Sequence, residues 1–351
     1  MVDVLVRRDD PRTVRCDPGE PPRTGVPQGS VQFAVERFGL TANNLTYAVL
    51  GDAWRYWDHF PAPEGWGRVP VWGFGRATAS GVDGVAAGDR FFGFWPMSSR
   101  VTLEVAAGPG GLADRSAARA SLARVYGRYA RALPETGFPP GLDDVAAVLR
   151  PLFQTGWLLA DRVAREGAGV VVLTSASSRT AVCTAAAVRA HGDPPELVGL
   201  TSSRHAAATA ALGLYDRVLT YEEVGALPAD RGAVLVDLAG DPDLRAAVHR
   251  RTAGVLRASV VVGATHWTRA SFASSGLPGP EPEVFSAPAA AAALDPSSAR
   301  RIAAAWPDFA ATRAPGLLTV EHRTGAQAVT EAWAALLDGD VDPRRGLVLS
   351  L

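Results

Sequence analysis

The sequence contains no lysine, so all of its 35 basic residues are arginine. This absence excludes a lysine Schiff base, the lysine of a P-loop and the Tyr-x-x-x-Lys pair of short-chain dehydrogenases. Asparagine is nearly as rare, because Asn43 and Asn44 are the only two. A bias in genomic base composition explains both shortages. Asparagines that persist despite such a bias make Asn43, Asn44 and the nearby Tyr47 candidates for a functional site.

Cysteine, long apolar runs and excess charge are also scarce. Cys16 and Cys183 lie far apart and outside any C-x-x-C motif, so we expect neither a disulfide framework nor a metal. No apolar run approaches the ~20 residues that span a bilayer, and the N-terminus carries charges where a signal peptide is apolar. The net charge of −1 gives no electrostatic reason to bind nucleic acid or an anionic membrane. We therefore predict a cytoplasmic protein.

The first part of the chain changes character twice. The residues before Ser30 are rich in Pro, Gly and Arg and are predicted to be irregular, apart from a strand at Val2–Val6. Short β-branched and aromatic runs punctuated by glycine then predict a small, irregular β-barrel-like domain. Apolar residues recur at helical spacing over 116–133, which predicts an amphipathic helix, and 142–169 predicts two further helices separated at Pro151.

The middle of the chain alternates apolar strand-like runs with helix-like segments, a pattern typical of a doubly wound parallel sheet. The tail differs again, with alanine-rich helical segments and two strand-like runs. We therefore predict three parts along the chain. These are a domain of residues 1–150 with an added helical segment near 113–150, a cofactor-binding domain of residues 151–285, and a return to the first domain over residues 286–351.

The stretch VVVLTSASSRTAV, Val170 to Val182, follows the pattern of a nucleotide-binding strand, turn and helix. In a Rossmann unit such a turn brings backbone N–H groups and a helix N-terminus to a pyrophosphate. Small residues replace the usual glycines, and hydroxyl groups and a guanidinium add donors for phosphate. An ordinary strand–helix turn is the alternative. The residues predicted to contact the cofactor here are Ser175, Ala176, Ser177, Ser178, Arg179 and Thr180.

The second strand of this region ends in Thr201, Ser202, Ser203 and Arg204, where an NAD-preferring site usually has an acidic residue. Hydroxyls and a guanidinium suit a 2′-phosphate, so the predicted cofactor is NADPH. A solvated arginine at a helix start is the alternative. The later strand ends are predicted to add cofactor contacts from Ala239, Gly240, Gly263, Ala264 and Thr265.

The order of these parts resembles the medium-chain dehydrogenase/reductase superfamily, most closely its zinc-independent quinone reductase and enoyl reductase branch. GDRFFGF (Gly88–Phe94) resembles its G-D-R-V-x-G step, and GAGVVVLTSASSRTAV stands where the branch has V-x-G-A-S-G-G-V-G. LGLYDRVLTYEE and the C-terminal AWAALLDGDVDPRRGLVLSL also resemble it, while TANNLTYAVLGD, GFWPM and PLFQTGWLL resemble a bacterial offshoot. The resemblance implies an α/β fold with a GroES-like β-barrel catalytic domain and a Rossmann doubly wound parallel-sheet domain.

The chain departs from the superfamily in three ways, the first of which is the replacement of the turn glycines, which bears on the strength and pose of cofactor binding. It has no cysteine between residues 17 and 182, so both the catalytic and the structural zinc sites of the zinc-dependent members are expected to be absent. The segment 113–150 is longer than the usual linker. It could cap the active-site cleft, or it could form a subunit contact and make the protein a homodimer.

The segment NNLTYAVLGD lies where related reductases have N-P-x-x-x-Y-x-x-x-G. The resemblance implies that Tyr47 lines the active site and donates a proton, and that Asn43 or Asn44 holds the nicotinamide ribose region or the substrate carbonyl. A barrel tyrosine with its hydroxyl at the surface is the alternative.

An aromatic substrate pocket is a further prediction, although each of its residues could equally be core. His266 at a strand end is a candidate acid, and a structural or surface histidine is the alternative. His59 is likewise either an acid or a structural or surface histidine. The remaining residues considered for the pocket are Trp54, Tyr56, Trp57, Phe94, Trp95 and Met97.

Without zinc, hydride transfer from a nicotinamide needs a hydrogen-bond donor to the acceptor carbonyl and a proton donor to the adjacent carbon. We therefore expect an NADPH-dependent, zinc-independent oxidoreductase that reduces an activated C=C or C=O of a small organic substrate. The alternative keeps the fold with a degenerate nucleotide site and a non-redox, lyase-like activity or a binding role.

Overall fold

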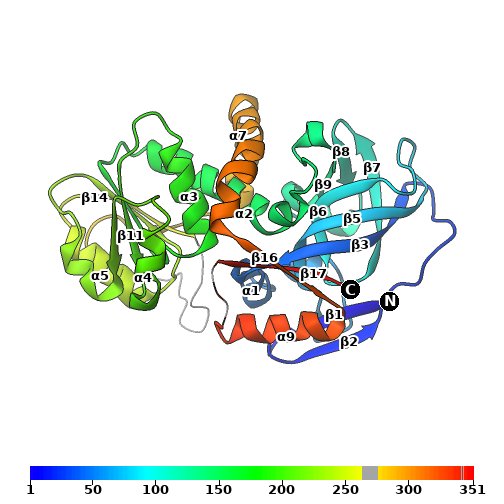
Figure 1. The fold of residues 1–351 in the computed structure, drawn as a ribbon. Coiled ribbons are helices and arrows are strands. Elements are labelled where there is room, and N and C mark those ends of the chain that lie inside the picture. Colours follow the sequence, from blue (N-terminus) through cyan, green and yellow to red (C-terminus); the bar gives the residue numbers. More distant parts are fainter. Residues whose placement is uncertain (263–275, 341, 343) are drawn as a thin grey trace. The chain divides into compact units, whose positions relative to one another are not determined.

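The computed structural model describes residues 1–262, 276–340, 342 and 344–351, and the chain forms two compact units (Figure 1). The first unit combines Met1–Pro151 with Asp295–Leu351, and the second comprises Leu152–Leu294. The sequence pattern predicted boundaries after residues 150 and 285. The second unit therefore extends nine residues further along the chain than predicted, to the end of an alanine-rich helix.

The first unit is built on an eight-stranded sheet in the order β16-β17-β3-β5-β6-β9-β8-β7. An additional antiparallel pairing of β3 with β7 closes six of these strands into a barrel, which confirms the predicted barrel domain. The strands are β3 (Ser30–Leu40), β5 (Pro70–Ser80), β6 (Arg90–Pro96), β7 (Arg100–Gly108), β8 (Gly111–Asp114), β9 (Arg128–Arg131), β16 (Thr319–Thr324) and β17 (Arg345–Ser350).

A smaller antiparallel sheet, β2-β1-β4, belongs to the same unit, with β1 (Val2–Arg7), β2 (Val14–Pro18) and β4 (Trp66–Gly67). The prediction that the N-terminal residues are irregular beyond one strand was wrong, because β2 pairs with β1 along its length. The helices of the unit are α1 (Ala42–Val49), η1 (Tyr56–Asp58), η2 (Ala117–Arg119), η3 (Arg124–Gly127), η4 (Pro134–Thr136), α7 (Pro296–Asp308), η6 (Phe309–Arg313), α8 (Ala314–Leu317) and α9 (Ala326–Leu337).

The amphipathic helix predicted over 116–133 is not formed. The segment contains the two short 3-10 turns η2 and η3 and then β9, which pairs with both β6 and β8. Tyr129 of β9 is buried in the barrel, with its ring centroid 4.7 Å from that of Trp95. The helical spacing of apolar residues was thus overridden by backbone pairing and by burial of an aromatic ring inside the barrel.

One continuous helix, α2 (Asp143–Ala164), replaces the two helices predicted on either side of Pro151. A proline inside a helix has no N–H for the carbonyl four residues earlier, here Ala147. Gly39 of β3 lies against this carbonyl, and a Cβ at Gly39 would overlap its oxygen. The packing of β3 against α2 therefore requires a glycine at residue 39.

The second unit is a six-stranded parallel sheet in the order β12-β11-β10-β13-β14-β15, which confirms the predicted doubly wound domain. The chain adds strands on one side of β10 and then on the other, so the carboxyl ends of β10 and β13 mark the switch point where such sheets bind ligands. Its elements are β10 (Val170–Leu173), α3 (Arg179–Arg189), β11 (Glu196–Thr201), α4 (Ser203–Ala210), β12 (Arg217–Thr220), η5 (Tyr221–Ala226), β13 (Ala233–Asp237), α5 (Pro242–Thr252), β14 (Leu256–Val261), β15 (Glu283–Val284) and α6 (Ala287–Ala292).

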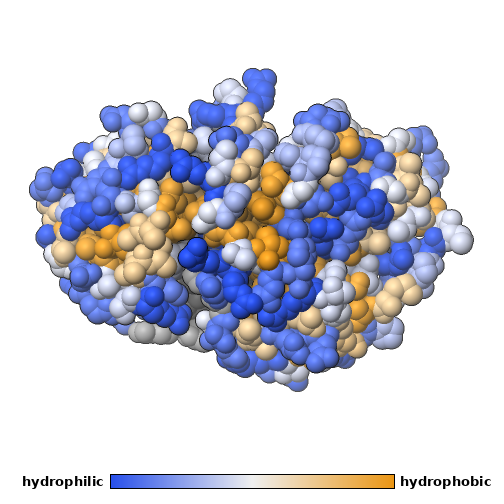
Figure 2. All heavy atoms as spheres, in the orientation of Figure 1, coloured by the Kyte–Doolittle hydropathy of each residue, from blue (hydrophilic) through white to orange (hydrophobic). Residues whose placement is uncertain are grey.

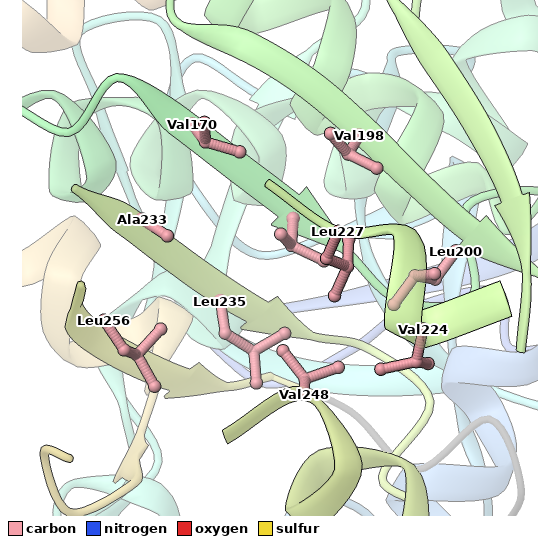
Figure 3. Close-up of a cluster of buried hydrophobic side chains, with 10 residues drawn as sticks. Val170, Val198, Leu200, Val224, Leu227, Ala233, Leu235, Val248 and Leu256 are labelled. Atoms are coloured by element: carbon pink, nitrogen blue, oxygen red, sulfur yellow. The ribbon is translucent and has the colours of Figure 1, made fainter. Parts of the chain in front are cut away.

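Branched aliphatic side chains fill the space between this sheet, η5 and α5 (Figure 3). Val224 of η5 and Val248 of α5 meet residues of β10, β11 and β13, and every member is at most 8% exposed. Burial of this kind contributes ~25 cal/mol for each Å² of apolar surface removed from water. The cluster comprises Val170, Val172, Val198, Leu200, Val224, Leu227, Ala233, Leu235, Val248 and Leu256.

No helix in the described part of the chain is both long and apolar enough to cross a membrane. The face drawn in Figure 2 interleaves hydrophilic and hydrophobic residues.

Candidate active site

Helix α1 follows directly from β3, and its start is held by a capping box. The backbone N–H of Thr41 donates to Oδ1 of Asn44 at 2.8 Å, and Nδ2 of Asn44 donates to the carbonyl of Pro70 at 2.9 Å. Asn44 is buried, and both ends of its amide group are engaged within the protein. The predicted role of Asn44 at the cofactor or substrate is therefore corrected: its side chain ties α1 to the start of β5.

Tyr47 lies one turn further along α1 and is only 4% exposed. Its hydroxyl oxygen accepts two hydrogen bonds, from Nδ2 of Asn43 at 2.7 Å and from Nε1 of Trp72 at 3.2 Å. No described residue accepts the proton of this hydroxyl. Tyr47 is thus oriented by two donors and can donate its own proton elsewhere.

Burial and the neighbouring phenol of Tyr56 raise the pKa of Tyr47 above its ordinary value of 10, and the bonds from Trp72 and Asn43 oppose this rise only in part. The phenol is therefore neutral at physiological pH and acts as a donor. The predicted roles of Tyr47 and Asn43 stay predictions, and the surface alternative for Tyr47 conflicts with its burial.

Tyr47 belongs to a group of aromatic residues that we call the tyrosine cluster, of which all but the half-buried Trp72 are buried: Tyr47, Tyr56, His59, Trp72, Phe94 and Tyr126. The rings of Tyr47 and Tyr56 are 4.6 Å apart between centroids, and the hydroxyls of Tyr56 and Tyr126 share a hydrogen bond of 3.2 Å. Trp72 and Tyr126 were not predicted from the sequence. Tyr126 lies in η3, within the segment predicted to be a helix, so its position beside Tyr47 could not be foreseen.

His59 lies within the same cluster, with its ring centroid 5.1 Å from Tyr126 and 5.3 Å from Phe94. Burial, followed by the positive charge of Arg119, lowers the pKa of His59 from 6.5 to about 4. His59 is therefore a neutral imidazole above pH 4. The burial of His59 conflicts with the surface alternative, and its role as an acid stays a prediction.

Three of the four tryptophan and methionine residues predicted for the substrate pocket are core residues. Trp57 is 1% exposed and Trp95 and Met97 are fully buried, so they present no surface to a substrate, which corrects their predicted role. Trp95 instead donates to the carbonyl of Gly73 inside the barrel. Trp54 is 39% exposed, and His266 lies outside the described residues.

The turn after β10 is shaped by protein contacts at its centre. Ser175 adopts a left-handed backbone with φ of +50°, a conformation that favours glycine. Ala176 is fully buried, its N–H donates to the carbonyl of Leu200 at 2.9 Å, and its carbonyl accepts from the hydroxyl of Tyr215 at 2.8 Å. Gly199 makes room for this arrangement, because a Cβ there would be 2.8 Å from that of Ala176. The predicted contact of Ala176 with a cofactor is therefore corrected.

The rest of the turn keeps donors for a ligand. Ser178 is the N-cap of α3, and its hydroxyl accepts from the N–H of Ala181 at 3.3 Å. The N–H groups of Ser177 and Thr180 donate to no described atom and belong to the positive end of the helix dipole. Arg179 is the first residue of α3 and is half-buried.

The turns after β10 and β11 meet at His205, which the sequence analysis missed. Its Nδ1 lies 3.4 Å from the hydroxyls of both Ser177 and Ser202, and Thr201 donates to Ser177 at 3.3 Å. Ser203 and Arg204 are exposed in the first turn of α4. The structure thus brings the predicted pyrophosphate turn and the predicted 2′-phosphate turn together.

The loop after β13 is held by a buried ion pair. Nη1 of Arg245 lies 2.8 Å from Oδ2 of Asp237, and both side chains are fully buried. Oδ1 of Asp237 accepts from the hydroxyl of Thr174 at 2.7 Å and from the N–H groups of Ala239 and Gly240, each at 3.1 Å.

The two loop residues predicted to contact the cofactor, Ala239 and Gly240, therefore have their backbone N–H groups bonded within the protein. Ala239 is fully buried and its amide is also bonded to Thr174, so its predicted cofactor contact is corrected. Gly240 is buried beside it, and its predicted cofactor contact stays a prediction. The other predicted contacts at a strand end, Gly263, Ala264 and Thr265, lie outside the described residues. Across the described residues, no three His, Cys, Asp or Glu side chains group as a metal site would require.

Solved structures with the same two-part architecture span nearly the whole chain. CurA from Vibrio vulnificus in complex with NADPH is 12% identical, with a TM-score of 0.63 and coverage of 100% of this chain and 99% of that one. Mycobacterial Rv1454c complexed with NADPH is 15% identical, with a TM-score of 0.60 and full coverage of both chains. Escherichia coli quinone oxidoreductase complexed with NADPH is 12% identical, with a TM-score of 0.59 and full coverage of both chains. These likenesses show the fold, a GroES-like barrel with a Rossmann domain, as the sequence resemblance implied.

A family model described as "Protein of unknown function (DUF2855)" matches residues 38–342, and the chain belongs to this family. Comparison with curated proteins found no match.

We expect the buried histidine of the tyrosine cluster to make stability depend on pH. Because the pKa of His59 is about 4 when folded and 6.5 when unfolded, the unfolded chain alone binds this proton between these values. Stability is therefore lost as the pH falls from 6.5 to 4, by about 3 kcal/mol. Urea unfolding at pH 7 and pH 4.5 should show a smaller loss in His59→Phe. The exposed His322→Phe serves as control, and an equal loss in all three proteins would contradict the assignment.

The buried ion pair predicts a large loss of stability in Arg245→Met, because the carboxylate of Asp237 would stay buried without its cation. The free energy of unfolding in urea should fall by about 3–5 kcal/mol. Arg250→Met on the exposed face of the same helix should change it by less than about 0.5 kcal/mol. A loss for Arg245→Met no larger than this control would show that the pair does not hold the loop.

Proposed function

We propose that the protein is an NADPH-dependent, zinc-independent oxidoreductase that reduces an activated C=C or C=O of a small organic substrate, as quinone and enoyl reductases do. The observation that carries the proposal is the hydroxyl of Tyr47, which accepts hydrogen bonds from Asn43 and Trp72 and keeps its proton for a further acceptor. Support comes from the shared fold, since CurA, Rv1454c and the quinone oxidoreductase were each solved with NADPH.

The residues around the turns after β10 and β11 fit a phosphorylated dinucleotide. The N–H groups of Ser177 and Thr180 and the N-terminus of α3 supply donors for a pyrophosphate. Ser202, Ser203 and Arg204 supply hydroxyls and one guanidinium for a 2′-phosphate, and no described carboxylate pairs with Arg204.

When NADPH is bound, its nicotinamide supplies a hydride. The neutral phenol of Tyr47 donates a hydrogen bond to the substrate oxygen and polarises the carbonyl, and it can give up its proton as charge develops. Asn43 and Trp72 then stabilise the phenolate through the two bonds that they already make. The surrounding rings of Tyr56 and Phe94 keep this hydroxyl in apolar surroundings, where such bonds are stronger than in water.

A fold without redox turnover, used for a lyase-like reaction or for binding, is the second candidate. Two observations support it. The backbone N–H and C=O of Ala176 are already bonded to Leu200 and Tyr215, and the hydroxyl of Ser178 already accepts a bond from the first turn of α3. Fewer groups are then left for a pyrophosphate than in a glycine turn. Titration with NADPH separates the two, since no binding at millimolar cofactor would favour this second candidate.

We expect purified protein to bind NADPH more tightly than NADH. Arg204→Ala should weaken NADPH binding about tenfold and leave NADH unchanged, because a charge-assisted contact to the 2′-phosphate is lost. Arg250→Ala, another exposed arginine of the second unit, is the matched control. Isothermal titration measures both constants, and equal weak affinity for the two cofactors would contradict NADPH preference.

Tyr47→Phe should lower turnover about 10²–10⁴-fold without weakening NADPH binding, because only the proton donor is removed. Turnover is measured as NADPH oxidation with a panel of enones, quinones and aldehydes. Since the pKa of Tyr47 is raised, its protonated form persists to pH 10, and the Tyr47-dependent rate should show no loss centred near that pH. Tyr129→Phe removes a buried hydroxyl outside the cluster and should keep full activity. Equal rates for both variants would exclude Tyr47 as the donor.

A further inference from the structure

Arg150 of α2 is a half-buried cation whose described neighbours are all neutral. Its Nη1 donates to the carbonyl of Gly137 at 2.7 Å, and its Nη2 makes a weaker bond of 3.5 Å to the carbonyl of Thr136. Its other N–H groups donate to no described atom, and no described carboxylate pairs with it. Burial lowers the pKa of Arg150 from 12.5 to about 10, so the guanidinium still carries its positive charge at neutral pH.

Other half-buried arginines of the first unit have carboxylate partners. Arg37 lies 2.8 Å from Asp144, and Arg119 lies 2.7 Å from Asp114. A charge removed from water is costly unless an opposite charge or strong hydrogen bonds compensate it. The positive charge of Arg150 is met only by carbonyl groups and aromatic rings among the described residues, which makes it suited to an anion supplied by a ligand.

Three aromatic rings hold the guanidinium of Arg150 in place. Its Cζ lies 4.2 Å from the ring centroid of Phe138, 5.5 Å from that of Trp306 and 5.8 Å from that of Phe92. Trp306 also donates to the carbonyl of Gly137 at 2.9 Å, the same oxygen that Arg150 bonds. These contacts restrict the orientation of the guanidinium, so its remaining N–H groups are presented in a fixed geometry.

Two rings connect Arg150 with Tyr47 along strands β5 and β6. Nε1 of Trp72 donates to the hydroxyl of Tyr47, and the ring of Trp72 is stacked on that of Phe92 at 5.8 Å. Phe92 in turn is the third ring at the guanidinium of Arg150. Trp72 and Arg150 are both half-buried, so each keeps part of its surface in contact with solvent. A ligand reaches these surfaces without entering the space between packed rings.

We propose that Arg150 binds a carboxylate of the substrate, while Tyr47 contacts a carbonyl oxygen of the same molecule. This rests on the proposed function and deepens it, because it restricts the substrate to carbonyl compounds that carry a carboxylate. The planar guanidinium matches the two oxygens of a carboxylate. Its single charge balances one carboxylate, whereas a phosphate dianion would keep an excess negative charge. Arg150 takes no part in bond breaking and is a specificity residue.

The test is isothermal titration of the full chain, without NADPH, with 4-acetylbenzoate and its methyl ester, which differ by one negative charge. The wild type should bind 4-acetylbenzoate at least tenfold more tightly, because only the carboxylate makes charge-assisted bonds. Arg150→Met should abolish this difference by weakening binding of the carboxylate alone. Arg150→Lys keeps the charge without the planar fork and should restore part of it. Arg128→Met, at an exposed position of β9, is the control and should change neither constant.

Equal affinity of the wild type for the two probes, or no measurable binding of either at millimolar concentration, would overturn the inference. So would tighter binding of 4-acetylphenyl phosphate than of 4-acetylbenzoate. Near-ultraviolet circular dichroism shows whether each variant is folded, and the comparison of the probes needs the wild type alone. A carboxylate preference in a protein that does not bind NADPH would refute the proposed function and leave the Arg150 site standing. NADPH oxidation with neutral acceptors and no carboxylate preference would do the reverse.

Discussion

The pairing of β3 with β5 on one side and β7 on the other is the constraint on which the first unit depends. This double pairing closes six strands into a barrel, and β17 from the end of the chain adds to the same strand at Phe38–Leu40. Because α1 begins two residues after β3 ends, the barrel also fixes where Tyr47 lies. Asn44 secures this junction through its bond to the start of β5. The candidate active site is thus a consequence of strand closure.

In both units a buried polar side chain holds neighbouring segments together through hydrogen bonds. In the second unit Asp237 gathers Thr174, Arg245 and two backbone amides, so the loop after β13 has a single arrangement. Such networks are stable only when their members are satisfied, because a buried polar group without a partner is costly. The hydroxyl of Tyr47 accepts two hydrogen bonds and donates none among the described residues, whereas both ends of the Asn44 amide group are engaged.

The two turns at the carboxyl ends of β10 and β11 contain few glycines, and their close packing is achieved by other means. Ser175 takes the left-handed backbone that a glycine would adopt more easily, and Gly199 on the next strand supplies the space that Ala176 needs. The turn therefore needs a small residue both after β10, at Ala176, and in β11, at Gly199. Hydroxyl groups around His205 then link the two turns.

The sequence by itself determined the parallel sheet and the barrel, and it predicted Tyr47 as a candidate proton donor. Apolar strands alternating with helices fit a doubly wound sheet, and the motifs resembling medium-chain reductases lie in the order that the fold requires. Only the tertiary structure decided the rest. Residues 128–131 are a strand because the barrel offered backbone partners. Helix α2 is continuous through Pro151, and β3 packs against it at Gly39, where a Cβ would overlap the carbonyl oxygen of Ala147. Tyr126 reaches Tyr47 from 79 residues away, a contact that no local pattern encodes, since local periodicity reports which residues are apolar and not which distant rings they meet.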